Sequence, residues 1–266
     1  MATRTYFLGG NTAEGFASCY EHFCPAEAGN FLWVIKGGPG CGKSSFMRKI
    51  GRHAEEIGLD VEYVLCSGDP DSLDGVYIPA LNLGYVDGTA PHILDPKYPA
   101  ISGAYHDLGQ FYDMDALRGN ASVIRSIYNQ YKECYAAAYT LLATKQQSVQ
   151  ISAENFKRRR FMSAITCKGI VHLPTEPMDA DALQHLASAP SVYTCILHPL
   201  WQKQAIGIVK NGTAYAIPLE IPNCDDAIAH LREAKALHDE LERLYNPHVN
   251  FDEIYKLADK HIQKYL

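Results

Sequence analysis

The sequence has little that would favour export, membrane insertion or binding to nucleic acid. It begins without the apolar stretch of a secretory signal peptide. No run approaches the roughly 20 apolar residues of a membrane span. A formal net charge of −6 gives no electrostatic attraction to nucleic acid or to an anionic membrane surface. We therefore expect a cytoplasmic protein with neither of these partners.

The sequence also has no Cys-x-x-Cys pair, although it contains eight cysteines. Zinc ribbons and disulfide frameworks are therefore not indicated. Cys66 and Cys195 lie in apolar, strand-like runs, where a free thiol behaves as a small hydrophobe. We expect reduced, mostly buried cysteines in a chain whose 266 residues and 47% hydrophobic content suffice for one large or two small domains.

The most informative stretch that is present is FLWVIKGGPGCGKSS, residues 31–45. It contains the spacing Gly-x-x-x-x-Gly-Lys-Ser of a phosphate-binding P-loop, ending at Ser44. The apolar run 31–35 predicts a buried strand before the loop, and residues 44–57 predict a helix after it. The apolar stripe of that helix consists of Phe46, Met47, Ile50, Ala54 and Ile57. Strand, loop and helix in this order is the context that the motif requires.

The residue types in this loop suit the chemistry of a nucleoside triphosphate. Glycines let the backbone approach the phosphates closely, and the converging N–H groups and the helix N-terminus favour an anion. Lys43 would lie between the β- and γ-phosphates as a catalytic cation, and the Ser44 hydroxyl would bind Mg²⁺. The predicted nucleotide-binding residues are Gly37, Gly38, Pro39, Gly40, Cys41, Gly42, Lys43, Ser44 and Ser45.

Cys41 is expected to differ from the other cysteines. A loop that binds anions would also stabilise a thiolate, which predicts unusual reactivity of Cys41 in the nucleotide-free protein and protection by ATP.

Two aspartates are candidates for the carboxylate that assists Mg²⁺ and catalysis. Residues 83–87 form an apolar run that ends in Asp87, as in a Walker B strand beside a P-loop. Asp69, in the carboxylate-rich segment 67–75, is the alternative. The two could also divide the work, one on the metal and one polarising the attacking water or a substrate hydroxyl.

The rest of the first half predicts strands, one short helix and one long helical segment. Strands are expected at 5–10, 61–66 and 76–78, a short helix from Thr12 to Phe23, an irregular Pro-rich loop at 89–111, and one or two long helices over 113–156. His92, His106 and Asp107 are interpreted as surface or capping residues rather than substrate contacts. The basic cluster 157–160 is interpreted as a solvated helix end rather than an arginine finger.

The second half shows weak similarity to the first, in the same order along the chain. Residues 7–16 align with 161–170, 61–70 with 192–199, and 88–90 with 212–214, but the second copy has no glycine loop. Strands are expected at 161–166, 192–197, 205–209 and 213–217, a helix near 180–188, and a hairpin turn at Asn211-Gly212. Two helices are expected at the end, capped near Asn223 and Asn250.

The segments YFLGGNTAEGF, IKGGPGCGKS, CSGDPDSLDG and EAKALHDELERLYNPHVNFDEI resemble an uncharacterised bacterial family of P-loop ATPases. Members of that family typically carry two tandem P-loop halves. The resemblance implies that the second phosphate loop has been lost here. It implies no substrate, because the family has no defined reaction.

Together these features predict an α/β P-loop NTPase fold with three layers (α/β/α) around a mainly parallel sheet. The nucleotide-binding domain would span 1–156, and the degenerate second repeat with its helical C-terminus 157–266. The expected function is Mg²⁺-dependent ATP hydrolysis with an unknown small-molecule or protein partner. Alternatives are a small-molecule or nucleotide kinase and a slow, nucleotide-gated regulator, since no Glu follows Asp87. ATP is favoured over GTP because no Asn-Lys-x-Asp motif is present.

Overall fold

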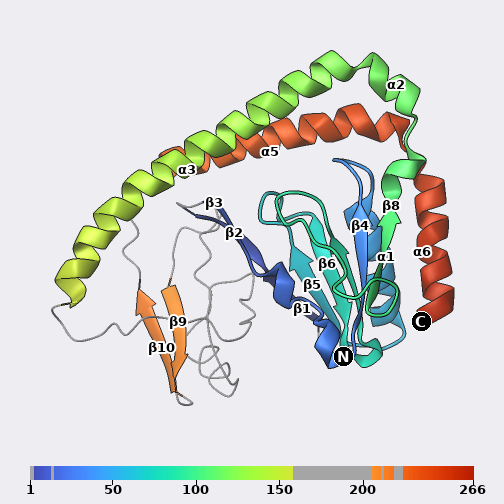
Figure 1. Cartoon of the computed structure of the whole chain (residues 1–266), viewed down its shortest axis with the longest axis horizontal. Helices are drawn as coiled ribbons and strands as arrows, with labels where there is room; N and C mark the ends of the chain where they lie inside the picture. Colours follow the sequence, from blue (N-terminus) through green and yellow to red (C-terminus); the bar gives the residue numbers. More distant parts are fainter. Residues whose placement is uncertain (1–2, 13–14, 158–204, 211–212, 219–223) are drawn as a thin grey trace.

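The centre of the molecule is a six-stranded sheet, seen in a computed structural model that describes residues 3–12, 15–157, 205–210, 213–218 and 224–266 (Figure 1). Its order is β1-β5-β6-β7-β4-β8. The strands are β1 (Thr3–Phe7), β4 (Phe31–Lys36), β5 (Val61–Leu65), β6 (Leu73–Ile78), β7 (Leu83–Asp87) and β8 (Gly103–Asp107). β6 is antiparallel to both of its neighbours, and every other pair is parallel. The fold is therefore α/β, with a mixed but mostly parallel sheet.

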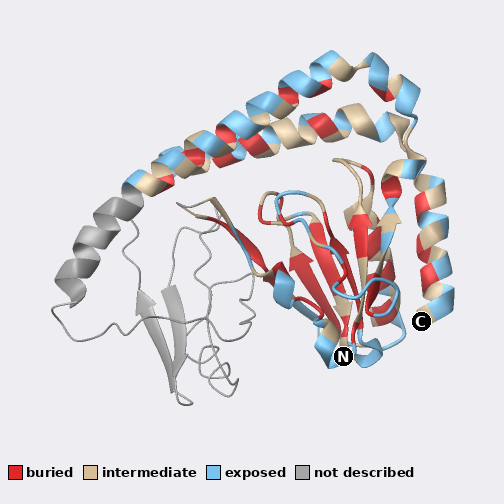
Figure 2. Ribbon diagram, viewed as in Figure 1, coloured by how far each residue is buried: buried red, intermediate tan, exposed pale blue. Residues whose placement is uncertain are grey.

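Alternation along the strands sends neighbouring side chains to opposite faces of this sheet. On one face, Ile35 packs with α1 (Lys43–Glu56) and α6 (Phe251–Tyr265) in a core that includes Phe46 and Ile254. On the other face, Val34 packs with Tyr20 and neighbouring side chains. Figure 2 shows that β5, β6 and β7 are almost wholly buried, whereas the edge strands β1 and β8 are partly exposed.

The second face differs from the predicted three-layer arrangement. In the described part of the chain, its core is covered by side chains from residues 16–24 and by Leu94. These residues belong to a β-hairpin, a 3₁₀ turn (Tyr20–His22) and a loop, not to an α-helix. The expected helical layer is thus present on only one face among the described residues.

A pair of long helices leaves the sheet and forms what we call the helical arm. It consists of α3 (Ala121–Lys157), which follows the short helix α2 (Met114–Gly119), and α5 (Asp225–Tyr245), which runs back beside it (Figure 1). Where the arm begins, Ile124 and Ile127 pack against Leu241. The C-terminal end of α5 thereby returns to the sheet, and the 3₁₀ turn Asn246–His248 leads into α6.

Most of the elements with a strong local pattern are confirmed. The predicted strands at 31–35, 61–66 and 83–87 are present, as are the helices at 44–57 and 113–156 and the two C-terminal helices. The Asn250 side chain caps α6 by accepting a hydrogen bond from the Glu253 N–H at 3.3 Å.

Two predictions in the first half are wrong. The strands β2 (Gly9–Thr12) and β3 (Gly15–Ser18) pair antiparallel as a hairpin, and the 3₁₀ turn Tyr20–His22 follows, in place of the end of the short strand predicted at 5–10 and the helix predicted at 12–23. The ring of Phe16 lies against Gly9, at a position that a Cβ would fill, so the glycine permits this pairing. The loop predicted at 89–111 contains β8 and a 3₁₀ turn (Leu108–Phe111), which were missed because GAYHD is a short, half-polar edge strand.

In the second half, β9 (Ala205–Lys210) and β10 (Thr213–Pro218) pair antiparallel, as predicted at 205–209 and 213–217. The predicted turn at 211–212, the strands at 161–166 and 192–197, the helix at 180–188 and residues 158–160 of the basic cluster lie outside the described residues. The repeat and the domain division at residues 156 and 157 stay predictions. Among the described helices, none is both long and apolar enough to cross a membrane.

The packed imidazoles of His106 and His261 predict a loss of stability in acid. Their Nε2 atoms share a hydrogen bond beside Trp33, and burial lowers the pKa of each ring to about 4. In the unfolded chain the pKa of a histidine is about 6.5. At pH values between the folded and the unfolded pKa, the unfolded state therefore binds more protons than the folded state. The free energy of unfolding should therefore fall by about 1–2 kcal/mol per histidine between pH 7 and pH 5.

Urea unfolding of the wild type, His106→Gln and His22→Gln at both pH values tests this prediction. His22 is exposed, so His22→Gln should keep the wild-type pH dependence. In His106→Gln, the fall in the free energy of unfolding between pH 7 and pH 5 should be smaller by at least the contribution of one histidine. Equal pH dependence in all three proteins would contradict the assignment.

Candidate functional site

The candidate site lies where β4 ends and α1 begins. The loop between them has positive φ angles at Gly37 (149°), Gly40 (64°) and Gly42 (82°). Gly42 is in the left-handed region immediately before the first helical residue, Lys43. These conformations strain residues that carry a side chain, which explains the glycines at these positions. The residues predicted from the motif thus form a loop, residues 37–42, and the first turn of the partly buried helix α1, an arrangement that favours anions.

Lys43 is held inside this loop rather than in solvent. Its Nζ donates hydrogen bonds to the carbonyl oxygens of Gly37 (2.8 Å) and Gly38 (2.9 Å) and lies 3.5 Å from Asp87 Oδ2. Burial is the largest single influence and would lower the pKa of Lys43, but Asp87, Cys41 and Asp74 together outweigh it and raise that pKa overall. The ammonium is therefore charged, and it is positioned where the loop can present it to an anion.

Asp87 reaches Lys43 because β7 lies directly beside β4, with Ile35 paired to Asp87 in the register. Its Oδ1 accepts hydrogen bonds from the Thr89 N–H (2.8 Å) and the Thr89 hydroxyl (2.6 Å). Oδ2 is left facing the ammonium. The carboxylate at the end of this strand is thus fixed in orientation, with one oxygen turned toward the loop.

Ser44 and Asp69 have different surroundings. The Ser44 Oγ accepts a hydrogen bond from the Leu73 N–H at 2.9 Å, which holds the first turn of α1 against the start of β6. Asp69 is buried, but its oxygens contact the Ser72 hydroxyl (2.7 Å) and Lys235 of α5 (3.1 Å). Asp69 therefore connects the loop after β5 to the helical arm, whereas Asp87 contacts the P-loop lysine.

The surroundings of Cys41 do not favour the predicted reactivity. Its side chain is only 1% exposed, and burial raises the pKa of the thiol despite the nearby Lys43 ammonium. The cost of placing a thiolate in this buried position exceeds the attraction of the lysine and the helix N-terminus.

Sequence reasoning gave little weight to three further residues at this edge of the sheet, Asp74, His92 and Tyr20. The Asp74 and Asp87 carboxylates and the His92 imidazole offer one atom each within 4.8 Å of one another, and all three residues are buried. The Tyr20 hydroxyl donates to Asp74 Oδ2 at 2.7 Å. The carboxylate-rich run 67–75 was the available signal for Asp74. Its meeting with Asp87 depends on the antiparallel placement of β6, which no local pattern indicates.

The end of α5 packs on the tip of the P-loop. A Cβ on Gly40 would lie only 3.0 Å from the Cα of Glu242. With its amide oriented to satisfy its neighbours, Asn246 donates from its side-chain nitrogen to the Gly40 carbonyl (2.7 Å). The tip of the loop and the end of the helical arm are therefore in direct contact.

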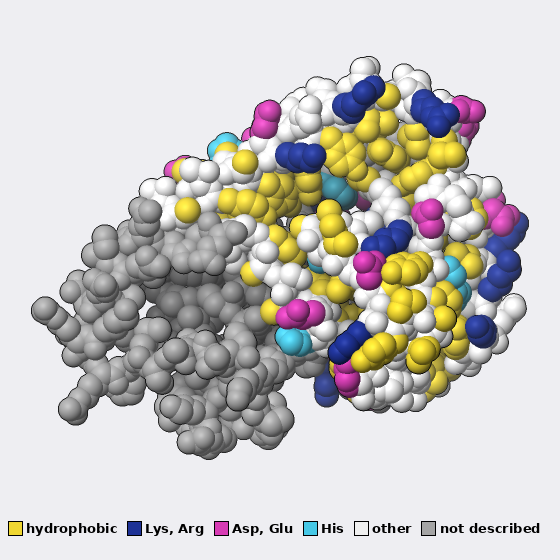
Figure 3. All heavy atoms as spheres, viewed as in Figure 1, with side chains coloured by type: hydrophobic (Ala, Val, Ile, Leu, Met, Phe, Trp, Pro, Cys, Tyr) yellow, Lys and Arg dark blue, Asp and Glu magenta, His cyan; other side chains and the backbone are white. Residues whose placement is uncertain are grey.

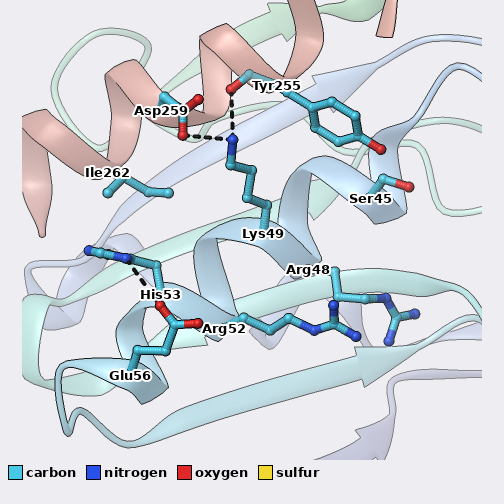
Figure 4. Close-up of a pocket in the computed structure, with 9 residues that line it drawn as sticks. All are labelled: Ser45, Arg48, Lys49, Arg52, His53, Glu56, Tyr255, Asp259 and Ile262. Atoms are coloured by element: carbon cyan, nitrogen blue, oxygen red, sulfur yellow. Dashed lines mark hydrogen bonds and ion pairs between the residues drawn. The ribbon is translucent and has the colours of Figure 1, made fainter. Parts of the chain in front are cut away.

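A cavity of about 530 Å³ lies on the outer side of α1, between this helix and α6 (Figure 4). Within it, Lys49 contacts Asp259 at 2.7 Å, and His53 contacts Glu56 at 3.6 Å. Ser45 is the one P-loop residue in its lining. Since several of its charged groups already pair with one another, we interpret this cavity as part of the α1–α6 packing.

The charge distribution of the surface offers no large basic patch on the face shown in Figure 3. In that view the Lys and Arg side chains of the described residues are scattered, and hydrophobic side chains gather along the helical arm. Comparisons of the chain with protein-family models, with characterised proteins and with solved structures gave no match. The site is therefore interpreted from its own geometry.

Burial of the Cys41 thiol predicts slow alkylation. In the native protein, iodoacetamide should modify Cys41 much more slowly than in the urea-unfolded chain, with or without ATP, as measured by peptide mass spectrometry. Rapid modification that ATP prevents would instead support a stabilised thiolate.

Proposed function

We propose that this chain binds the phosphates of a nucleoside triphosphate, with Mg²⁺, at the loop 37–45, and that ATP is the nucleotide. The observation that carries the proposal is Lys43, whose side chain is 13% exposed at the N-terminus of α1, hydrogen-bonded to two loop carbonyls and paired with Asp87. A lysine held in a glycine-rich loop at a helix N-terminus favours a polyanionic ligand.

The surrounding groups fit such a ligand. The loop amides and the helix N-terminus supply partial positive charge, and Lys43 supplies a full one. Asp87 and Ser44 provide the oxygen ligands that Mg²⁺ prefers, directly or through water. When bound, the cation would neutralise charge on the phosphates. In this proposal Lys43 stabilises charge on the terminal phosphate and Asp87 orients the metal's water ligands.

Asp69 is a weaker candidate for the metal. It is already paired with Lys235 on the helical arm, and its second oxygen accepts from Ser72. We therefore assign the carboxylate of the site to Asp87 and a positioning role to Asp69. The kinase alternative placed an acceptor site at the loop 89–111 and the cluster of Asp69, Asp71 and Asp74, with 157–160 as the one candidate for an arginine-rich lid. Of that basic cluster, residues 158–160 are outside the described part of the chain.

Substitution of Lys43 tests the binding proposal. A charge-assisted hydrogen bond contributes about 1.5–3 kcal/mol, so Lys43→Ala should weaken ATP binding by about 10–100-fold in a calorimetric titration. Lys49→Ala is the matched control, because Lys49 lies on the same helix but pairs with Asp259. Equal affinities of the wild type and Lys43→Ala would refute the site, provided that both show cooperative unfolding.

The two aspartates can be separated in the same assay. Asp87→Asn should reduce the dependence of ATP binding on Mg²⁺, whereas Asp69→Asn should leave that dependence unchanged. If Asp69→Asn reduced the Mg²⁺ dependence and Asp87→Asn did not, Asp69 would be the residue that holds the metal.

A second candidate function, slow nucleotide-gated regulation, is favoured by the contact between the P-loop tip and α5. Because Glu242 and Asn246 touch Gly40, a change in the loop on nucleotide binding would reach the arm directly. The residues after Asp87, Gly88 and Thr89, provide no carboxylate to activate water. In this alternative, ATP binding alters the arm and turnover is slow.

Hydrogen exchange tests this coupling. ATP should change amide exchange over residues 240–248 in the wild type, and Gly40→Ala should raise exchange there and weaken the response to ATP. Gly58→Ala is the control, since Gly58 also has a positive φ (87°) but a Cβ there would meet nothing within 4 Å. Unchanged exchange on ATP binding, or turnover of many ATP molecules per second, would contradict the regulatory role.

A further inference from the structure

The structure assigns a second kind of ligand to the same edge of the sheet: we propose that Asp74, Asp87 and His92 bind one divalent transition-metal cation of the Mn²⁺ class. The proposed cation site shares Asp87 with the proposed nucleotide site, but it uses neither phosphate nor Lys43 as a ligand. It depends on three side chains that come from two strands and a loop.

The sheet topology brings the two carboxylates together. β6 runs antiparallel to β7, and Gly75 is paired with Val86. The next residues along this ladder are Asp74, near the start of β6, and Asp87, at the end of β7. An antiparallel strand therefore places a carboxylate from its beginning at the edge where the parallel strands end. Both side chains are buried, with exposures of 5% and 11%.

His92 supplies the observation that points to a ligand. Its side chain is only 4% exposed, and neither ring nitrogen has a hydrogen-bond partner. Nε2 is 3.7 Å from Asp74 Oδ2, too far for a hydrogen bond. A buried imidazole with two unsatisfied nitrogens is costly unless something binds there. A cation between the imidazole and the carboxylates would use this nitrogen as a ligand.

The neighbours orient these groups as outer-shell residues orient metal ligands. The Tyr20 ring stacks on His92 at a centroid distance of 4.3 Å, and its hydroxyl donates to Asp74. Thr89 donates two hydrogen bonds to Oδ1 of Asp87, while Oδ2 faces the Lys43 ammonium at 3.5 Å, which a bound cation would displace. Fixed rotamers and hydrogen-bonded carboxylates are features that support a metal in proteins.

The ligand set determines the class of metal. Mg²⁺ prefers an all-oxygen environment, whereas Mn²⁺, Fe²⁺ and Zn²⁺ accept imidazole together with carboxylates. Two carboxylates also carry enough negative charge to compensate a divalent cation in a buried position. Mn²⁺ is the most suitable probe, because its low affinity for thiols keeps the cysteines of the chain from competing.

Mn²⁺ alone, added to the full chain without nucleotide, tests the proposal by electron paramagnetic resonance. We expect one bound Mn²⁺ per chain. His92→Gln and Asp74→Asn should each weaken its binding by about ten-fold or more, since even outer-shell changes cost 10–100-fold. His22→Gln, at an exposed histidine, is the matched control and should bind as the wild type does. Lys43→Ala removes the ammonium that competes for Asp87, so this variant should bind Mn²⁺ at least as tightly as the wild type while its ATP binding weakens.

Pulsed electron paramagnetic resonance on the wild-type protein identifies the ligands without any variant that must fold. Electron spin-echo modulation should show one imidazole nitrogen coupled to the bound Mn²⁺. Absence of Mn²⁺ binding, a bound ion without nitrogen coupling, or equal affinity in the wild type and a folded His92→Gln would each overturn the proposal. Loss of ATP binding in Lys43→Ala with retained Mn²⁺ would support both sites, and retained ATP binding would refute the nucleotide site alone.

Discussion

The ion pair between Lys43 and Asp87 is the interaction on which the rest of the site depends. Both side chains are nearly buried, and such a pair is stable only when further hydrogen bonds compensate for lost hydration. Here two loop carbonyls satisfy the ammonium, and Thr89 satisfies the carboxylate. The pair therefore joins the P-loop, the first turn of α1 and the end of β7 into one unit. An incoming phosphate would compete with Asp87 for the same ammonium, and a metal would compete with the ammonium for the same carboxylate.

The position of this unit explains how the remainder of the chain can respond to it. The strands end at one edge of the sheet, where β6 adds Asp74 and the loop after β7 adds His92. The helical arm meets the same region twice, through Gly40 at the P-loop tip and through the Asp69–Lys235 ion pair. A ligand at this edge thus lies next to two contacts that hold the arm. In physical terms, binding and arm position are coupled if the ligand alters either contact.

The sequence predicts those parts of the fold that depend on interactions between residues close together in the chain. The P-loop unit, β5, β7 and the long helices have strong local patterns, and they were predicted with small errors at their ends. Pairing between distant segments has no local signal, so the antiparallel placement of β6 could not be predicted. For the same reason, the proximity of Asp74 to Asp87 could not be predicted. The hairpin at Gly9–Ser18 and the edge strand β8 were missed because their strands are short and lack a clear apolar pattern. The burial of Cys41, which opposes the favourable charges around its thiol, also had no local signal.

The central claim, that the loop 37–45 holds phosphate, is tested most directly by the amide resonances of the loop itself. In a titration with ATP and Mg²⁺, the ¹H–¹⁵N signals of residues 38–44, assigned by comparison with single-site variants, should move first and most, with the Thr89 amide following as Asp87 releases Lys43. Shifts confined to other parts of the chain, or no shifts at millimolar ATP, would contradict the account.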